Sequence, residues 1–168
     1  IIGGSKISTK INVIESLTNH CDWLIVGGAL ANTCDAAQGK NIGKSLFEPS
    51  YLDVAKKIIE HPQIVIPTFV VVSNGSSIVE KSVNELSDED IIFDVGQQSV
   101  EAFSQYIDEA NTIVWNGPLG KFEEDEFSKG TEGIAEKIAE SNAMTIIGGG
   151  ETLAAFAKIE MMKSVDYA

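Results

Sequence analysis

The chain is organised around the segment Thr112-Ile113-Val114-Trp115-Asn116-Gly117-Pro118-Leu119-Gly120-Lys121-Phe122-Glu123. Its first residues are apolar and β-branched, which predicts a buried strand. The Asn-Gly-Pro sequence and the second glycine then predict a loop at the end of that strand. Ligands of open α/β sheets bind at this end of the strands. Taken alone, the segment fits a polar turn beside a core tryptophan equally well.

A second strand with glycines at its end strengthens the binding hypothesis. In residues 145–152, Thr-Ile-Ile-Gly-Gly-Gly-Glu-Thr, a β-branched run meets three glycines, and a helical pattern then opens at Glu151. Glycines let a backbone approach phosphate closely, and a helix N-terminus offers free N–H groups at the positive end of its dipole. The sequence therefore predicts an anion site after this strand.

The N-terminal residues 3–10, Gly-Gly-Ser-Lys-Ile-Ser-Thr-Lys, add a pair of cations. Lys6 and Lys10 are four residues apart, so one helical turn is expected to bring their ammonium groups together, with Ser5 or Ser8 as the cap. Positive charge at a helix start is unfavourable unless an anion is bound, which favours a phosphate site over two solvated lysines.

The order of elements predicts one doubly wound, Rossmann-like α/β domain over residues 1–168. Predicted strands alternate with predicted helices, which implies a mainly parallel sheet with helices on both faces. Helices are expected over 29–37, 51–59, 100–107, 127–138 and from 154 onward. Residues 73–90 are polar and acidic, and are expected to form surface turns with at most one short strand near 78–79.

Composition excludes several classes of function. The 168 residues carry a formal net charge of −13, which argues against nonspecific nucleic-acid binding. No apolar run is long enough to span a bilayer and no signal peptide is visible. Cys21 and Cys34 are too few for a disulfide framework or a zinc site, so we interpret them as free thiols in a reducing cytosol.

The basic residues are all lysines, and no arginine is present. Phosphoryl-transfer sites usually use arginine for its bidentate contacts. A nucleotide site can be built from lysines, N–H groups and a metal, whereas a complete kinase site for an anionic acceptor is harder to build. The P-loop spacing is not met and no G-x-G-x-x-G follows a strand, so a phosphate site must be assembled from several strand ends.

The three glycine-rich segments, in their order, resemble the C-terminal half of phosphoglycerate kinases of the bacterial type. The segments 26–29 and 42–46 fit the same pattern, and the resemblance covers nearly the whole chain. It implies a cytoplasmic, monomeric kinase that transfers a phosphoryl group between 1,3-bisphosphoglycerate and ADP, giving 3-phosphoglycerate and ATP. It also implies an N-terminal phosphoglycerate-binding domain and a C-terminal glycine-rich segment outside this chain.

The resemblance also implies a role for residues at the base and ribose end of the nucleotide. Gly27, Gly28 and Leu46 would lie along the adenine slot, and Glu123 would take the ribose hydroxyls. Two residues of the organising segment would border the nucleotide, namely Asn116 and Pro118. By residue type alone, Leu46 is an ordinary core residue, and Glu123 belongs to an acidic run that is typical of a solvated face.

At the phosphate end, the resemblance implies that Lys10 binds phosphates and that Lys6 contacts the phosphoryl group in flight. The β and γ phosphates and Mg²⁺ would be held by Gly149, Gly150, Glu151 and Thr152, with Glu151 as the metal ligand. A carboxylate beside phosphates is repulsive unless a cation bridges them, and Mg²⁺ is usually held by one or two carboxylates plus phosphate oxygens.

The chain departs from the family pattern at four positions in and around the expected site. Glu151 replaces the usual aspartate, Ala29 replaces a glycine, Lys121 stands where aliphatic residues are commoner, and Ile92 narrows the expected adenine slot. A noncatalytic α/β module that binds a nucleotide or dinucleotide is the alternative that these residues leave open.

Overall fold

A parallel sheet forms the centre of the computed structural model, which describes residues 1–160, 162 and 165–168. In spatial order, the sheet contains β2 (Ile64–Val65), β1 (Leu24–Ile25), the bridging residue Ile2, β6 (Thr112–Asn116) and β7 (Met144–Gly148). Tyr167 forms a further parallel bridge to Ile146 of β7. Leu24 lies opposite Ile64 and Thr112 lies opposite Met144, and both pairs of strands are parallel.

Ile2 joins the two pairs of strands into one sheet. It forms parallel bridges to both Val26 and Asn116. Its N–H donates to the Ile25 carbonyl at 2.8 Å, and the N–H of Gly3 donates to the Asn116 carbonyl at 2.9 Å. The carboxyl ends of β1 and β6 are therefore held next to each other, one on each side of the glycines that follow Ile2.

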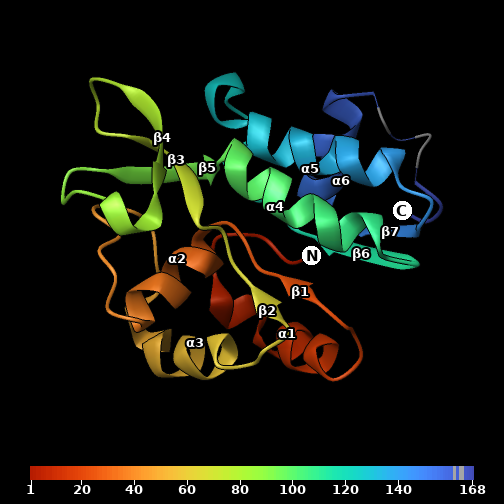
Figure 1. Ribbon diagram of the computed structural model, residues 1–168, viewed down its shortest axis with the longest axis horizontal. Coiled ribbons are helices and arrows are strands. Elements are labelled where there is room, and N and C mark those ends of the chain that lie inside the picture. Colours follow the sequence, from red (N-terminus) through yellow and green to blue (C-terminus); the bar gives the residue numbers. More distant parts are fainter. Residues whose placement is uncertain (161, 163–164) are drawn as a thin grey trace.

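Helices cover both faces of the sheet (Figure 1), which confirms the doubly wound α/β class. One layer contains α1 (Ile11–Thr18), α2 (Ala29–Ala37) and α3 (Leu52–Ile59), and the other contains α4 (Gln97–Asp108), α5 (Lys129–Glu140) and α6 (Gly150–Lys158). Strand residues alternate between the two cores, so Leu24 packs under the first layer and Ile25 under the second. Trp115 is completely buried in the second core, edge-on to Phe156, as expected for a core tryptophan.

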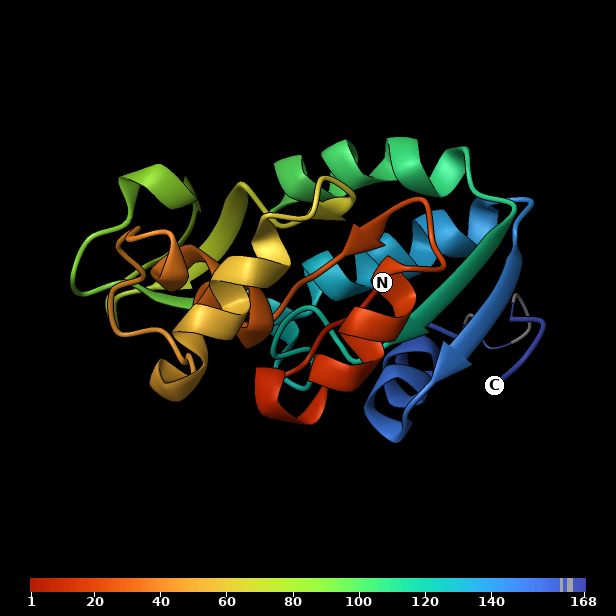
Figure 2. The ribbon, with the colours of Figure 1, turned by 90° about the horizontal axis from the view of Figure 1, so that it is seen from below.

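A separate antiparallel sheet lies at one end of the molecule, away from β6 and β7 (Figures 1 and 2). It consists of β4 (Ile78–Ser82), β3 (Phe69–Ser73) and β5 (Ile91–Val95), in that order. The expected short strand near 78–79 is therefore longer than predicted. Three of its five side chains are exposed, so the alternation that reveals a half-buried strand is missing there.

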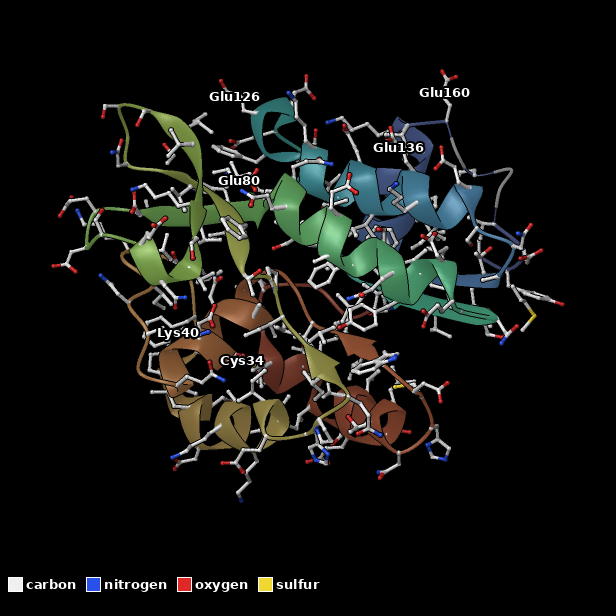
Figure 3. The ribbon with its side chains drawn as sticks, viewed as in Figure 1. Cys34, Lys40, Glu80, Glu126, Glu136 and Glu160 are labelled. Carbon is white, nitrogen blue, oxygen red and sulfur yellow. The ribbon has the colours of Figure 1, made fainter. Side chains whose placement is uncertain are left out.

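Short 3-10 helices complete the structure at η1 (Ile7–Thr9), η2 (Pro49–Tyr51), η3 (Val83–Glu85) and η4 (Asp125–Phe127). The predicted serine cap is wrong, because α1 begins at Ile11. The N-cap residues are Lys6 for η1 and Lys10 for α1, and neither makes a capping hydrogen bond through its side chain. The N–H and hydroxyl of Ser8 instead donate to the Glu48 carboxylate, at 2.9 and 2.6 Å. A distant carboxylate likewise serves α4, where Glu80 accepts the N–H groups of Gln97 and Gln98 at 3.0 Å (Figure 3).

Both cysteines are free, as predicted. Cys34 is a buried residue of α2 (Figure 3), and burial raises the pKa of its thiol to about 12, so the thiol stays protonated. None of the helices in the described part of the chain has the length and apolarity needed to cross a membrane.

Candidate functional site

A cavity of about 370 Å³ opens between α2, β5, the loop that follows β6 and the first turn of α6. Five of the residues predicted to bind a ligand line it, namely Gly28, Leu46, Pro118, Glu123 and Glu151. A second cavity, of about 480 Å³, lies at the amino ends of β1 and β6 and is lined by none of the predicted residues. The first cavity is therefore the candidate site, because residues predicted to bind a ligand line it.

Part of the wall of the first cavity is apolar, and we call this part the apolar slot. Leu46, Ile92 and Phe93 line it, together with Pro67 and Val70. The side chain of Leu46 is 60 % exposed, so the interpretation of Leu46 as a core residue is wrong. An exposed leucine beside two further apolar side chains offers a surface on which a planar, weakly polar ring can lie.

The two glycines at the end of β1 have different roles. Gly28 has φ +64°, and a Cβ there would lie 2.7 Å from the Gly4 carbonyl oxygen, so only glycine fits beside the cavity. Gly27 does not line the cavity itself. A Cβ on Gly27 would lie 2.5 Å from Cδ2 of Leu119, so this glycine makes room for a side chain that does line the cavity.

A second group of predicted residues meets where β6 ends and α6 begins. The Lys10 ammonium group donates to Oδ1 of Asn116. The hydroxyl of the buried Thr152 accepts the N–H of Gly117 at 2.7 Å. Gly149, with φ +92°, precedes Gly150, the first residue of α6.

This second group has the character of an anion site. The free N–H groups and the positive dipole end of α6 lie at the end of β7, and β7 pairs with β6, whose last residue, Asn116, is in contact with Lys10. Glu151 lies in the first turn of α6 and also lines the cavity. It connects the anion site with the apolar slot.

The prediction that Lys6 and Lys10 share the first turn of a helix is wrong. The two lysines flank the 3-10 helix η1 instead of sharing a turn of α1, and Lys6 is exposed. Partial burial acts to raise the pKa of Glu48, but hydrogen bonds from Ser8 and Ile7 and the charge of Lys6 outweigh it, so this pKa lies below its usual value. Glu48 thus stays ionised and fixes the segment that carries both lysines.

The described residues contain no cluster of three or more His, Cys, Asp or Glu side chains suited to a metal ion. Glu151 and Glu123 are both exposed at the cavity. This donor set fits a hard cation that brings most of its oxygen ligands from a bound phosphate and water, as Mg²⁺ does.

Among the residues of the cavity wall that sequence reasoning missed, Asp94 of β5 stands out, because it is charged and only 2 % exposed. Its Oδ2 accepts the N–H of Gly130 at 2.6 Å, whereas its Oδ1 is buried without a hydrogen-bond partner. Burial raises the pKa of Asp94 to about 7, because the nearby N–H groups that favour the carboxylate do not compensate for the lost hydration. A lone aspartate inside the apolar run 91–95 was the signal available in the sequence.

The comparisons with a family model and with solved structures all identify the same family. The family model for phosphoglycerate kinase matches residues 1–168. The phosphoglycerate kinase of Coxiella burnetii superposes with a TM-score of 0.94 and 40% sequence identity, over 99% of this chain and 46% of that chain. The phosphoglycerate kinase from Pyrococcus horikoshii OT3 superposes with a TM-score of 0.85 and 26% sequence identity, over 99% of this chain and 44% of that chain. The chain thus spans less than half the length of both solved structures.

Proposed function

The chain belongs to the phosphoglycerate kinase family, and from that premise we propose that it is the C-terminal, nucleotide-binding half of such a kinase, which binds Mg-ADP or Mg-ATP. The observation that carries the proposal is the position of Glu151. It lies at the junction between an apolar slot suited to a base and a helix N-terminus suited to phosphates. A nucleotide is a ligand with these two ends.

The base lies against Leu46 and Ile92 in the apolar slot, beside the bare backbone of Gly28. Glu123, exposed at the same cavity, accepts hydrogen bonds from the ribose hydroxyls, while Pro118 closes the wall beside it. The isoleucine side chain at position 92 makes the slot narrower and more apolar, which favours dispersion contacts over hydrogen bonds to the edge of the base.

The phosphates lie at the N-terminus of α6. Lys10 neutralises part of their charge, Asn116 and Thr152 fix the backbone around them, and Gly149 and Gly150 leave room for a close approach. Glu151 is the protein ligand of the Mg²⁺ that the nucleotide brings. The cation, when bound, neutralises the phosphate charge that develops during phosphoryl transfer.

We propose that the acceptor site lies outside this chain. 1,3-Bisphosphoglycerate and 3-phosphoglycerate are anions, while this chain has no arginine and a net charge of −13. Correct positioning of two reactants contributes about 7–11 kcal/mol to catalysis in well-oriented systems. The chain by itself should therefore bind nucleotide and turn over no phosphoglycerate. Lys6 would contact the phosphoryl group in flight only in the intact enzyme. The intact enzyme would work as a cytoplasmic monomer in glycolysis.

The test is a calorimetric titration of Mg-ADP into this chain and into the variant Lys10→Met. A lost charge-assisted contact to phosphate costs about 1.5–3 kcal/mol, so the dissociation constant should rise by about 10- to 100-fold. Lys56→Met is the matched control, because Lys56 is exposed on α3 outside the cavity. Equal affinities for all three proteins would contradict the assignment of the phosphate end.

A coupled assay on the same chain tests the second part of the proposal. We expect turnover of 1,3-bisphosphoglycerate below detection, because we propose that the acceptor site lies outside this chain. Turnover comparable with that of a complete phosphoglycerate kinase would show that an acceptor site exists within these residues.

A further inference from the structure

The carboxyl group of Asp94 lies where β5, α5 and the loop after β6 meet. Asp94 belongs to β5, its Oδ2 accepts the N–H of Gly130 in the first turn of α5, and its Oδ1 packs against Gly120 in the loop after β6. Oδ1 is buried and has no hydrogen-bond partner. A buried polar atom without a partner is rare in proteins, so this carboxyl group needs an explanation that the nucleotide contacts do not supply.

Two glycines make the space that this carboxyl group fills. A Cβ on Gly120 would lie 1.9 Å from Oδ1 of Asp94, and a Cβ on Gly130 would lie 2.8 Å from the same atom. Hydrogen bonds from two of its backbone N–H groups also hold the loop. The Leu119 N–H donates to the hydroxyl of Thr131 at 3.2 Å, and the Lys121 N–H donates to the carbonyl of Phe93 at 2.8 Å.

This packing fixes the loop residues that line the site. Leu119, Gly120, Lys121 and Glu123 all belong to the cavity wall, and the loop that carries them rests on the Asp94 carboxyl. A change in the charge or volume of that carboxyl therefore acts directly on the wall that receives the base and ribose.

The charges around Asp94 do not stabilise its ionised form. None of the ion pairs among the described residues involves Asp94. Glu132 of α5 acts to raise its pKa further. Four other charged groups line the cavity. Asp35 of α2 is paired with Lys40. Lys121 and Glu123 belong to the loop, and Glu151 belongs to α6.

We propose that Asp94 is a positioning residue of the nucleotide site, which holds the loop after β6 in place and takes up a proton when a nucleotide covers the cavity. This inference rests on the proposed function. A bound base replaces water in the cavity and lowers the local dielectric, and a lower dielectric disfavours an ionised carboxylate without a cationic partner. Binding and protonation of Asp94 therefore favour each other.

Adenosine is the probe for this inference, because it has no phosphate whose own ionisation would change near neutral pH. Calorimetric titrations in buffers with different ionisation enthalpies measure the number of protons taken up. If the bound nucleoside strengthens proton binding at Asp94 about tenfold, the affinity should be about fivefold weaker at about pH 8 than at about pH 6. In Asp94→Asn, no proton should be taken up and the affinity should be independent of pH.

A second pair of variants tests the inference even if Asp94→Asn does not fold. Glu132→Gln removes the neighbouring negative charge, so the pH at which the affinity falls should move downward. Glu136→Gln is the matched control, because Glu136 lies one turn further along α5 with its side chain exposed (Figure 3). Its profile should coincide with that of the wild type, because Glu136 does not contribute to the pKa of Asp94.

The outcomes separate this inference from the proposed function. Adenosine binding with the same affinity at every pH and without proton uptake overturns the role of Asp94 and leaves the nucleotide site intact. The same holds if Glu132→Gln and Glu136→Gln have identical profiles. If neither adenosine nor Mg-ADP binds at any pH, the proposed function fails and this inference fails with it.

Discussion

Two buried aspartates near the cavity should give the stability of this protein opposite dependences on pH. Asp90 and Asp94 are 1 % and 2 % exposed. Asp90 accepts hydrogen bonds from the Lys81 ammonium at 2.8 Å and from the N–H of Ser87 at 2.7 Å, and these partners hold its pKa below the ordinary value. Asp94 has no cation beside it, and burial raises its pKa to about 7.

The size of the effect at Asp94 follows from linkage. An unfolded chain releases this proton near the ordinary pKa of 3.8, and the folded chain releases it near 7. The stabilisation is complete below the lower value and is lost as the pH rises through the higher one. Between about pH 5.5 and about pH 8, the wild type should lose about 2 kcal/mol of unfolding free energy from this group alone.

The variant Asp94→Asn cannot lose a proton and should lack this slope. Its amide group leaves a different polar atom in the place of Oδ1, which costs about 1–3 kcal/mol at every pH. The slope, and not the offset, is therefore the quantity to compare. Relative to the wild type, the variant should gain about 2 kcal/mol of unfolding free energy from about pH 5.5 to about pH 8.

Urea unfolding at a series of pH values measures this difference. Asp90→Asn is the control of opposite sign, because a carboxyl with a lowered pKa contributes stability at neutral pH that disappears as the pH falls through its folded value. Asp90→Asn should thus be destabilising at neutral pH and progressively less so in acid. Parallel curves for Asp94→Asn and the wild type would refute the reasoning.

Three other substitutions test the site. Glu151→Gln should weaken binding of Mg-nucleotide far more than binding of metal-free nucleotide, because only the former needs the negative charge, and equal losses in calorimetry would leave Glu151 as a helix N-terminal acid. Leu46→Ala should leave the unfolding free energy within about 0.5 kcal/mol of the wild type, because Leu46 is 60 % exposed, while adenosine affinity measured by calorimetry falls. Thr152→Val leaves the buried N–H of Gly117 without its acceptor and should cost about 1–3 kcal/mol in urea unfolding, and a change below about 0.5 kcal/mol would contradict the role of that hydrogen bond.

The architecture was largely predictable because its signals are local. β-branched runs end in glycines at the strands β6 and β7, and helical periodicity returns between them, so the doubly wound α/β class follows from the sequence. The helix at Ala29–Ala37 was predicted with the bounds that the structure gives. These elements are decided by residues within a few positions of each other.

Long-range contacts explain what the sequence did not reveal. The segment around Ser8 is held by Glu48, which follows it by 40 positions, so no local rule could replace the serine cap. Leu46 has the residue type of a core position and is exposed only because of where its loop lies. The raised pKa of Asp94 depends on two glycines from other segments that bury it, and such an arrangement is visible only in three dimensions.

The bridge at Ile2 has a consequence for the order in which this chain folds. Strands β1 and β2 can pair early, as can β6 and β7, since each pair is joined by a single crossover through nearby helices. The sheet is completed only when the segment at Ile2 bonds to Val26 on one side and to Asn116 on the other, across most of the chain's length. Closing such a long loop has a large entropic cost before its contacts are gained, and contacts distant in sequence slow folding. We therefore expect the two halves of the sheet to collapse first and the anion site, which lies beside this bridge, to be assembled in the slowest kinetic phase.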